Sequence, residues 1–117
     1  AHNVAETTFF IGEVDGETPI VIEDIIDTGG SMEQVVEALL ARGALPEIHI
    51  LATHGVLSPP ATERLSHPAI KEVVVTNTIA IPPERNLPKL RSLSVAPVFG
   101  DAIRRIHQNI SVSVLFL

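Results

Sequence analysis

Three short apolar runs, rich in β-branched residues, constrain the fold of this chain most strongly. They lie at residues 19–23, 48–53 and 72–76, and in each of them apolar residues stand at consecutive positions. Strands with that pattern are buried on both faces, as in a parallel sheet. Helical patterns separate the runs. The sequence therefore predicts an α/β domain with a mostly parallel sheet flanked by helices.

The clearest helical pattern follows the first run. Ser31 and Gln34 have the spacing of a capping box, which predicts the start of a helix at Ser31. Apolar residues at helical spacing then share one face: Met32, Val35, Val36, Leu39 and Leu40. Gly43 suits the position just after the helix C-terminus.

Weaker patterns occupy the remainder of the chain. Residues 59–65 predict a short helix, and Pro97 suits the first turn of a last helix. The inner face of that last helix would hold Phe99, Ala102, Ile103 and Ile106. Short strands are expected at 7–11 and 93–95, a loop at 82–88, and a weak strand or extended tail at 111–116.

Composition excludes several classes of function. The 14 acidic residues outnumber the 8 Lys and Arg residues, which argues against nucleic-acid binding. No apolar run is long enough to cross a membrane and no signal peptide is visible, so we expect a cytoplasmic protein. Cysteine is absent, which excludes disulfides. The 117 residues fit one domain, and because they open on Ala1 we interpret them as a fragment.

The segment between the first run and its helix carries the chemistry. Its glycines permit a left-handed backbone and a close approach to a ligand, so successive amide N–H groups can converge on an anion at the helix N-terminus. Thr28 and Ser31 add hydroxyl donors. An acidic chain could hold a phosphate in this way without a lysine.

The acidic residues nearby suggest further roles. Asp27 would be repelled by a phosphate, which points to a role on a sugar or at a reaction centre. Glu23 and Asp24 suit vicinal hydroxyls, or a Mg²⁺ ion that bridges hydroxyls and a diphosphate. A bland alternative is a glycine-rich turn in which Ser31 caps the helix and the acids are solvated. The complete pattern is more specific than such a turn, and it matches neither a Walker loop nor a dinucleotide turn.

Residues 22–32 resemble the phosphoribosyl-diphosphate signature of type I phosphoribosyltransferases. Residues 52–58, 71–79, 102–107 and 111–116 resemble segments of the ribose-phosphate pyrophosphokinases, and the similarity runs from about Val4 to Phe116. Two positions depart from that family. Glu23 stands where an aspartate is usual, and Pro59 stands where a glycine is usual.

The resemblance implies an enzyme that uses Mg²⁺ to transfer the diphosphoryl group of ATP to the C1 hydroxyl of ribose 5-phosphate. The 5-phosphate would be bound by Asp27, Thr28, Gly29, Gly30 and Ser31. Glu23 and Asp24 would hold the ribose 2- and 3-hydroxyls and help to organise Mg²⁺. A tail that helps to form an inter-subunit site for phosphate or ADP is matched by Ser111, Val112, Ser113 and Phe116; the two serines could equally be plain edge-strand residues.

The resemblance also implies what this chain lacks. In the family, an N-terminal domain and neighbouring subunits hold ATP, and a catalytic Lys-Arg loop and a diphosphate loop lie upstream. We therefore expect residues 1–117 to form the C-terminal phosphoribosyltransferase-like domain, with Asp27 as the one candidate catalytic residue. The chain alone should bind ribose 5-phosphate without turnover. Because the missing strands should leave an apolar sheet edge exposed, we also expect self-association, and the family forms homo-oligomers.

Two other functions stay open at this point. A nucleobase phosphoribosyltransferase needs an aromatic to stack the base, and the four phenylalanines suit core or tail positions. A non-catalytic regulatory subunit of the pyrophosphokinase would not need an intact phosphate loop. The five histidines show no zinc spacing, and we expect His54 to be a backbone-bonded turn residue rather than a ligand.

Overall fold

The computed structural model describes residues 10–117. Its sheet has four parallel strands in the order β1-β2-β3-β4, namely β1 (Ile20–Ile26), β2 (Ile48–Gly55), β3 (Ile70–Thr76) and β4 (Leu90–Leu93). The helices are α1 (Gly30–Ala41), α2 (Ala61–Leu65) and α3 (Ala96–His107), and 3₁₀ turns occupy Pro83–Arg85 and Ser113–Phe116. The predicted parallel α/β architecture is confirmed. The strand predicted at 7–11 lies mostly outside the described residues.

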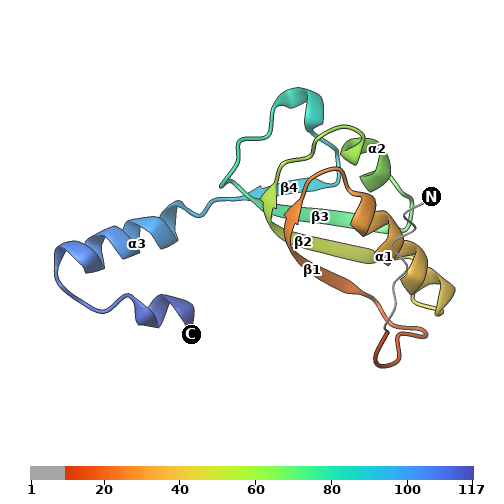
Figure 1. Cartoon of the computed structure of the whole chain (residues 1–117), viewed down its shortest axis with the longest axis horizontal. Coiled ribbons are helices and arrows are strands. Elements are labelled where there is room, and N and C mark those ends of the chain that lie inside the picture. Colours follow the sequence, from red (N-terminus) through yellow and green to blue (C-terminus); the bar gives the residue numbers. More distant parts are fainter. Residues whose placement is uncertain (1–9) are drawn as a thin grey trace, which may run out of the picture.

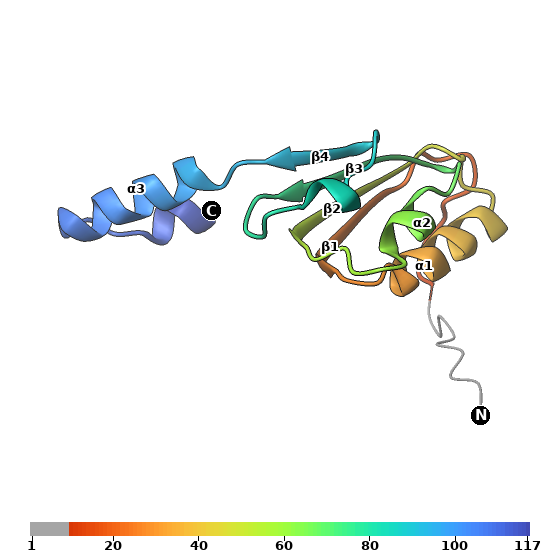
Figure 2. The same ribbon diagram turned by 90° about the horizontal axis from the view of Figure 1, so that it is seen from above.

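Helices α1 and α2 pack on the same face of the sheet (Figure 2), which we call the covered face. Its apolar side chains alternate along the strands, as expected for one face of a sheet. The side chains of Ile48, Ile50, Val73 and Val75 are each 0% exposed. From the helices, Met32, Val36 and Leu65 complete this core.

Helix α1 follows its sequence pattern along its length and at its C-terminus. Met32, Val36 and Leu39 are buried, and Val35 and Leu40 pack beside them. After Arg42, Gly43 adopts a left-handed backbone with φ of 84°. The N–H of Gly43 donates to the carbonyl of Leu40 and the N–H of Ala44 donates to that of Leu39. This pair of bonds is a Schellman motif, so the prediction for Gly43 is confirmed.

The opposite face of the sheet, which we call the open face, is not covered by any helix of residues 10–117 (Figure 2). Paired residues of parallel strands share a face, and the pairs Ile22↔Leu51 and Leu51↔Val74 lie here. Ile22 is 79% exposed and Leu93 is 59% exposed. An apolar hollow of about 200 Å³ crosses all four strands on this side. The strands were expected to be buried on both faces, and within residues 10–117 they are buried on one face only.

Residues 96–117, which we call the C-terminal arm, extend away from the sheet (Figure 1). Pro97 lies in the first turn of α3, as predicted. The predicted inner face is nevertheless in solvent, since Phe99, Ile103 and Ile106 are more than half exposed. The end of the arm is a 3₁₀ turn, so the weak strand predicted at 111–116 is wrong. Helical periodicity showed that one side of α3 is apolar, but not which surface covers it.

Candidate sugar-phosphate site

The candidate site lies where β1 passes into α1, at the carboxyl end of the parallel sheet. Ligands of open parallel sheets bind at this edge. The connecting residues 27–31, which we call the phosphate loop, line a hollow of about 160 Å³ together with Ile25, Ile26 and Met32. The residues that the sequence singled out for an anion therefore share one concave surface.

Gly29 shapes the entry into α1. Its φ of 79° is left-handed, a conformation that glycine adopts at no steric cost. Its carbonyl accepts the first helical bond, from the N–H of Glu33 at 3.0 Å. The N–H groups of the residues between Gly29 and Glu33 have no acceptor within the helix. Together with the positive end of the dipole of a 12-residue helix, they form a surface suited to an anion.

The capping box predicted at Ser31 is wrong. The helix begins at Gly30, Gly29 is the N-cap, and no side chain makes a capping hydrogen bond. The left-handed turn at Gly29 starts the helix earlier than the Ser31–Gln34 spacing suggests. Ser31 consequently lies inside the first turn, and it lines the hollow together with Thr28. This geometry excludes the N-cap role that the alternative of an ordinary glycine-rich turn gave to Ser31.

The three acidic residues do not gather in the hollow. Asp27 lines it, as expected for a loop residue. Glu23 is half-buried and pairs with Ala52, a residue of the covered face, whereas Asp24 is exposed. Neighbouring residues on a strand point to opposite faces, so these two carboxylates do not converge.

Glu23 and Asp24 could hold Mg²⁺ only together with ligands from outside these residues, such as water or substrate phosphates. Within residues 10–117, no group of three or more His, Asp or Glu residues is placed to hold a metal ion. Mg²⁺ commonly binds one or two carboxylates and completes its shell with water and substrate phosphates. Glu23 or Asp24 could each supply one such oxygen.

His54 at the end of β2 is held by a side chain. Its Nδ1 lies 2.7 Å from the hydroxyl of Thr78, and the hydroxyl of Thr76 donates to the carbonyl of Thr53 at 2.6 Å. The expectation of a backbone-bonded turn residue is wrong, because His54 lies within β2 and its partner is a threonine hydroxyl.

The residues of the predicted inter-subunit site lie in the C-terminal arm, at the far end of the molecule from β1 and α1 (Figure 1). The Ser113 N–H donates to the Ser111 hydroxyl at 3.2 Å, and Arg105 donates to the Ser111 carbonyl at 3.1 Å. Phe116 is 84% exposed. These contacts lie within the arm itself, so the inter-subunit site stays a prediction.

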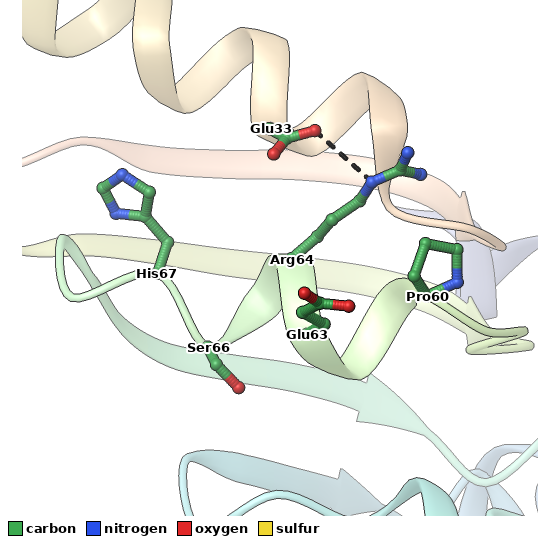
Figure 3. Close-up of a pocket in the computed structure, with 6 residues that line it drawn as sticks. All are labelled: Glu33, Pro60, Glu63, Arg64, Ser66 and His67. Carbon is green, nitrogen blue, oxygen red and sulfur yellow. Dashed lines mark ion pairs between the residues drawn. The ribbon is translucent and has the colours of Figure 1, made fainter.

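Arg64, which no sequence pattern singled out, lies beside the phosphate loop in the structure. Its guanidinium Nη1 donates to the carbonyl of Thr28 at 3.0 Å, and its Nε lies 3.3 Å from a carboxylate oxygen of Glu33 (Figure 3). Arg64 is 36 residues from Thr28 along the chain. Only the packing of α2 beside α1 joins them, and no local pattern signals that contact.

Comparison with known proteins identifies the family. The model of the phosphoribosyl synthetase-associated domain matches residues 5–117. This chain belongs to that family. A ribose-phosphate pyrophosphokinase of Caldanaerobacter subterraneus subsp. tengcongensis is 54% identical over 114 residues, which is 97% of this chain and 36% of that protein. A ribose-phosphate pyrophosphokinase of Bacillus cereus is 48% identical over 114 residues, again 97% of this chain and 36% of that protein.

The structure of this chain matches that of a solved relative. The phosphoribosylpyrophosphate synthetase from Mycobacterium smegmatis matches with a TM-score of 0.80 and 43% identity, over 85% of this chain and 33% of that chain. The chain thus spans about a third of the length of the relatives that it matches. Within residues 10–117, none of the helices has the length and apolar character needed to cross a membrane.

Proposed function

We propose that this chain is the ribose 5-phosphate-binding part of a ribose-phosphate pyrophosphokinase. The reaction would transfer the diphosphoryl group of ATP to the C1 hydroxyl of ribose 5-phosphate, giving phosphoribosyl diphosphate and AMP. The observation that carries the proposal is the concave phosphate loop at the N-terminus of α1, which is lined by Thr28, both glycines and Ser31. The names of relatives that are about half identical support the substrate.

In this proposal the loop binds the 5-phosphate through backbone amides and two hydroxyls. An anion at this position gains from the helix dipole as well as from the hydrogen bonds. Asp27 at the rim would face the sugar rather than the phosphate, because two anions repel each other. Glu23 and Asp24 lie inside β1 and point to opposite faces, so one of the two carboxylates would accept hydrogen bonds from the 2- and 3-hydroxyls of the ribose.

Magnesium is the cofactor that the proposal requires. Bound to the diphosphate, it would neutralise the charge that develops during transfer. Glu23 and Asp24 are its candidate ligands, each through a single oxygen. ATP itself would be held mainly by parts of the enzyme outside this chain, and the arm residues Ser111, Val112, Ser113 and Phe116 would contribute to a phosphate or ADP site between subunits.

The proposed enzyme is a cytoplasmic homo-oligomer. The open face and the exposed apolar side of α3 supply surfaces that another part of the protein or a second copy would bury. The absence of cysteine is compatible with a reducing compartment.

The test compares the full-length protein with the isolated chain. We expect the full-length protein to release AMP from ATP when ribose 5-phosphate and Mg²⁺ are present. The isolated chain should bind ribose 5-phosphate in calorimetry but release no AMP. Failure of the full-length protein to bind ribose 5-phosphate would overturn the proposed function. Normal AMP release by the isolated chain would show that upstream residues are not needed.

A further inference from the structure

We propose that Arg64 is a positioning residue for the phosphate loop, which turns the N–H of Gly29 toward the bound anion. This proposal rests on the proposed function and assigns a role to a residue on a different element, α2. Arg64 does not line the hollow of the phosphate loop. It lines a separate hollow, between α1 and α2, with Glu33 and His67 (Figure 3).

The geometry of one peptide unit carries the argument. The peptide bond between Thr28 and Gly29 is trans, since the one cis bond among residues 10–117 is Pro59–Pro60. In a planar trans peptide, the C=O and the N–H point in opposite directions. Arg64 binds the Thr28 carbonyl at 3.0 Å from the α2 side. The N–H of Gly29 is therefore directed to the other side of the peptide, away from Arg64.

The hydrogen bond from Arg64 to the Thr28 carbonyl also makes the N–H of Gly29 a stronger donor. A hydrogen bond from a guanidinium is charge-assisted and stronger than one between neutral groups. Because hydrogen bonds in a chain polarise each other, a carbonyl that accepts from a cation leaves the N–H of its peptide unit more positive. The charge of Arg64 also keeps the carbonyl oxygen from turning toward the phosphate, where it would repel the anion.

An ion pair and the close packing of the loop against α2 hold the guanidinium in this orientation. The Nε lies 3.3 Å from the Glu33 carboxylate, in the first turn of α1. The loop also lies very close to α2. A methyl group added at Gly30 would stand 3.3 Å from the Arg64 Nη1, and one at Gly29 would stand 3.5 Å from the Ala61 Cα. The loop and α2 therefore pack as one unit, with Arg64 as the polar contact between them.

The experiment is steady-state kinetics of the full-length protein carrying Arg64→Ala, with KM measured separately for ribose 5-phosphate and for ATP. Loss of a charge-assisted bond predicts a rise of about tenfold in KM for ribose 5-phosphate. The KM for ATP and kcat should stay within about twofold of the wild type, because the bond acts through ground-state binding of the phosphate. Affinity for ribose without a phosphate should not change.

Three further variants complete the design. Arg64→Lys keeps the charge but cannot serve Thr28 and Glu33 together through a planar fork, so it should recover only part of the affinity. Glu33→Gln should have a smaller effect than Arg64→Ala. Arg42→Ala is the matched control, since it removes the same charge from the far end of α1, where Arg42 lies over the Phe10 ring. It should leave both KM values unchanged.

Several results would overturn the role of Arg64. One is an unchanged KM for ribose 5-phosphate in Arg64→Ala, and another is an equal rise in both KM values, which marks a general structural role. If Arg64→Ala does not fold, the KM values of Arg64→Lys for ribose 5-phosphate and for ATP are judged in the same way. An active wild type with an unaffected Arg64 variant rejects this inference alone, whereas a wild type that does not bind ribose 5-phosphate rejects the proposed function.

Discussion

The covered face of the sheet and its open face carry similar apolar residues, but only the covered face is buried within residues 10–117. On the covered face, Ile50 and Val73 are each 0% exposed. On the open face, Ile22 is 79% exposed although it lies in the same sheet. The runs of consecutive apolar residues are typical of strands buried on both sides. The difference between the faces therefore marks an apolar surface that residues 10–117 do not cover.

The C-terminal arm has the same character as the open face. Its helix α3 has no buried residue, and its apolar side shows Phe99 and Ile103 at 59% and 67% exposure. The phosphate loop, by contrast, is attached to the covered face through α1 and braced by α2. The comparison teaches that the candidate ligand site belongs to the half with a buried core, while the other half presents apolar surface that residues 10–117 leave exposed.

We expect the largest difference between the two faces when one isoleucine of each face is replaced by alanine and the free energy of unfolding is measured. Ile50→Ala should lower the free energy of unfolding of this chain by about 3 kcal/mol, because it leaves a cavity in the core. Ile22→Ala should cost less than about 0.5 kcal/mol, since that side chain is in solvent. Urea unfolding measures both. Equal losses would show that the open face is buried in solution.

A second effect concerns the C-terminal arm. If the exposed apolar side of α3 contacts another copy, Phe99→Ser should weaken self-association by about 2 kcal/mol, the scale of one buried aromatic side chain. Sedimentation equilibrium over a concentration series measures the change. Gln108→Ser, at the polar end of the same helix, is the control and should have no effect. A chain that stays monomeric at every concentration would remove the basis for this interface.

The smallest effect is a pH dependence confined to the arm. Hydrogen bonds from Arg104 and Arg105 lower the pKa of Asp101 below its ordinary value of 3.8. The stabilisation that follows is fully present above 3.8 and is lost as the pH falls through the lower pKa of the folded state. A carboxyl titration followed by NMR should give a midpoint below 3.8 for Asp101. A midpoint at or above that value would mean that the ion pairs do not form in solution.

Local patterns predicted the parts of the fold that depend on local physics. The apolar face of α1 and the glycine at its C-terminus follow from helical spacing and from a left-handed turn, and both are confirmed at Val36 and Gly43. The strands lie where the apolar runs predicted them, with ends that differ by a few residues. The phosphate loop was found because its glycines and hydroxyls are consecutive in the chain.

The features that the sequence did not reveal depend on contacts between distant segments. Arg64 donates a hydrogen bond to the carbonyl of Thr28, 36 residues away, because a short helix that the sequence did predict packs beside α1 in a way that no local pattern reveals. The Ser31–Gln34 spacing suggested a capping box, but the left-handed turn at Gly29 begins the helix earlier. The amphipathic pattern of α3 is real, yet periodicity alone does not say what covers an apolar side.

The central claim is that the phosphate loop binds the 5-phosphate of ribose 5-phosphate. An NMR titration of the backbone amides of the uniformly ¹⁵N-labelled protein tests it most directly, with ribose as the matched ligand that lacks the phosphate. The account predicts that ribose 5-phosphate shifts the amide resonances of Gly29, Gly30 and Ser31 most strongly, and that ribose leaves these three nearly unchanged. Equal shifts with both ligands, or shifts elsewhere without any in the loop, would contradict it.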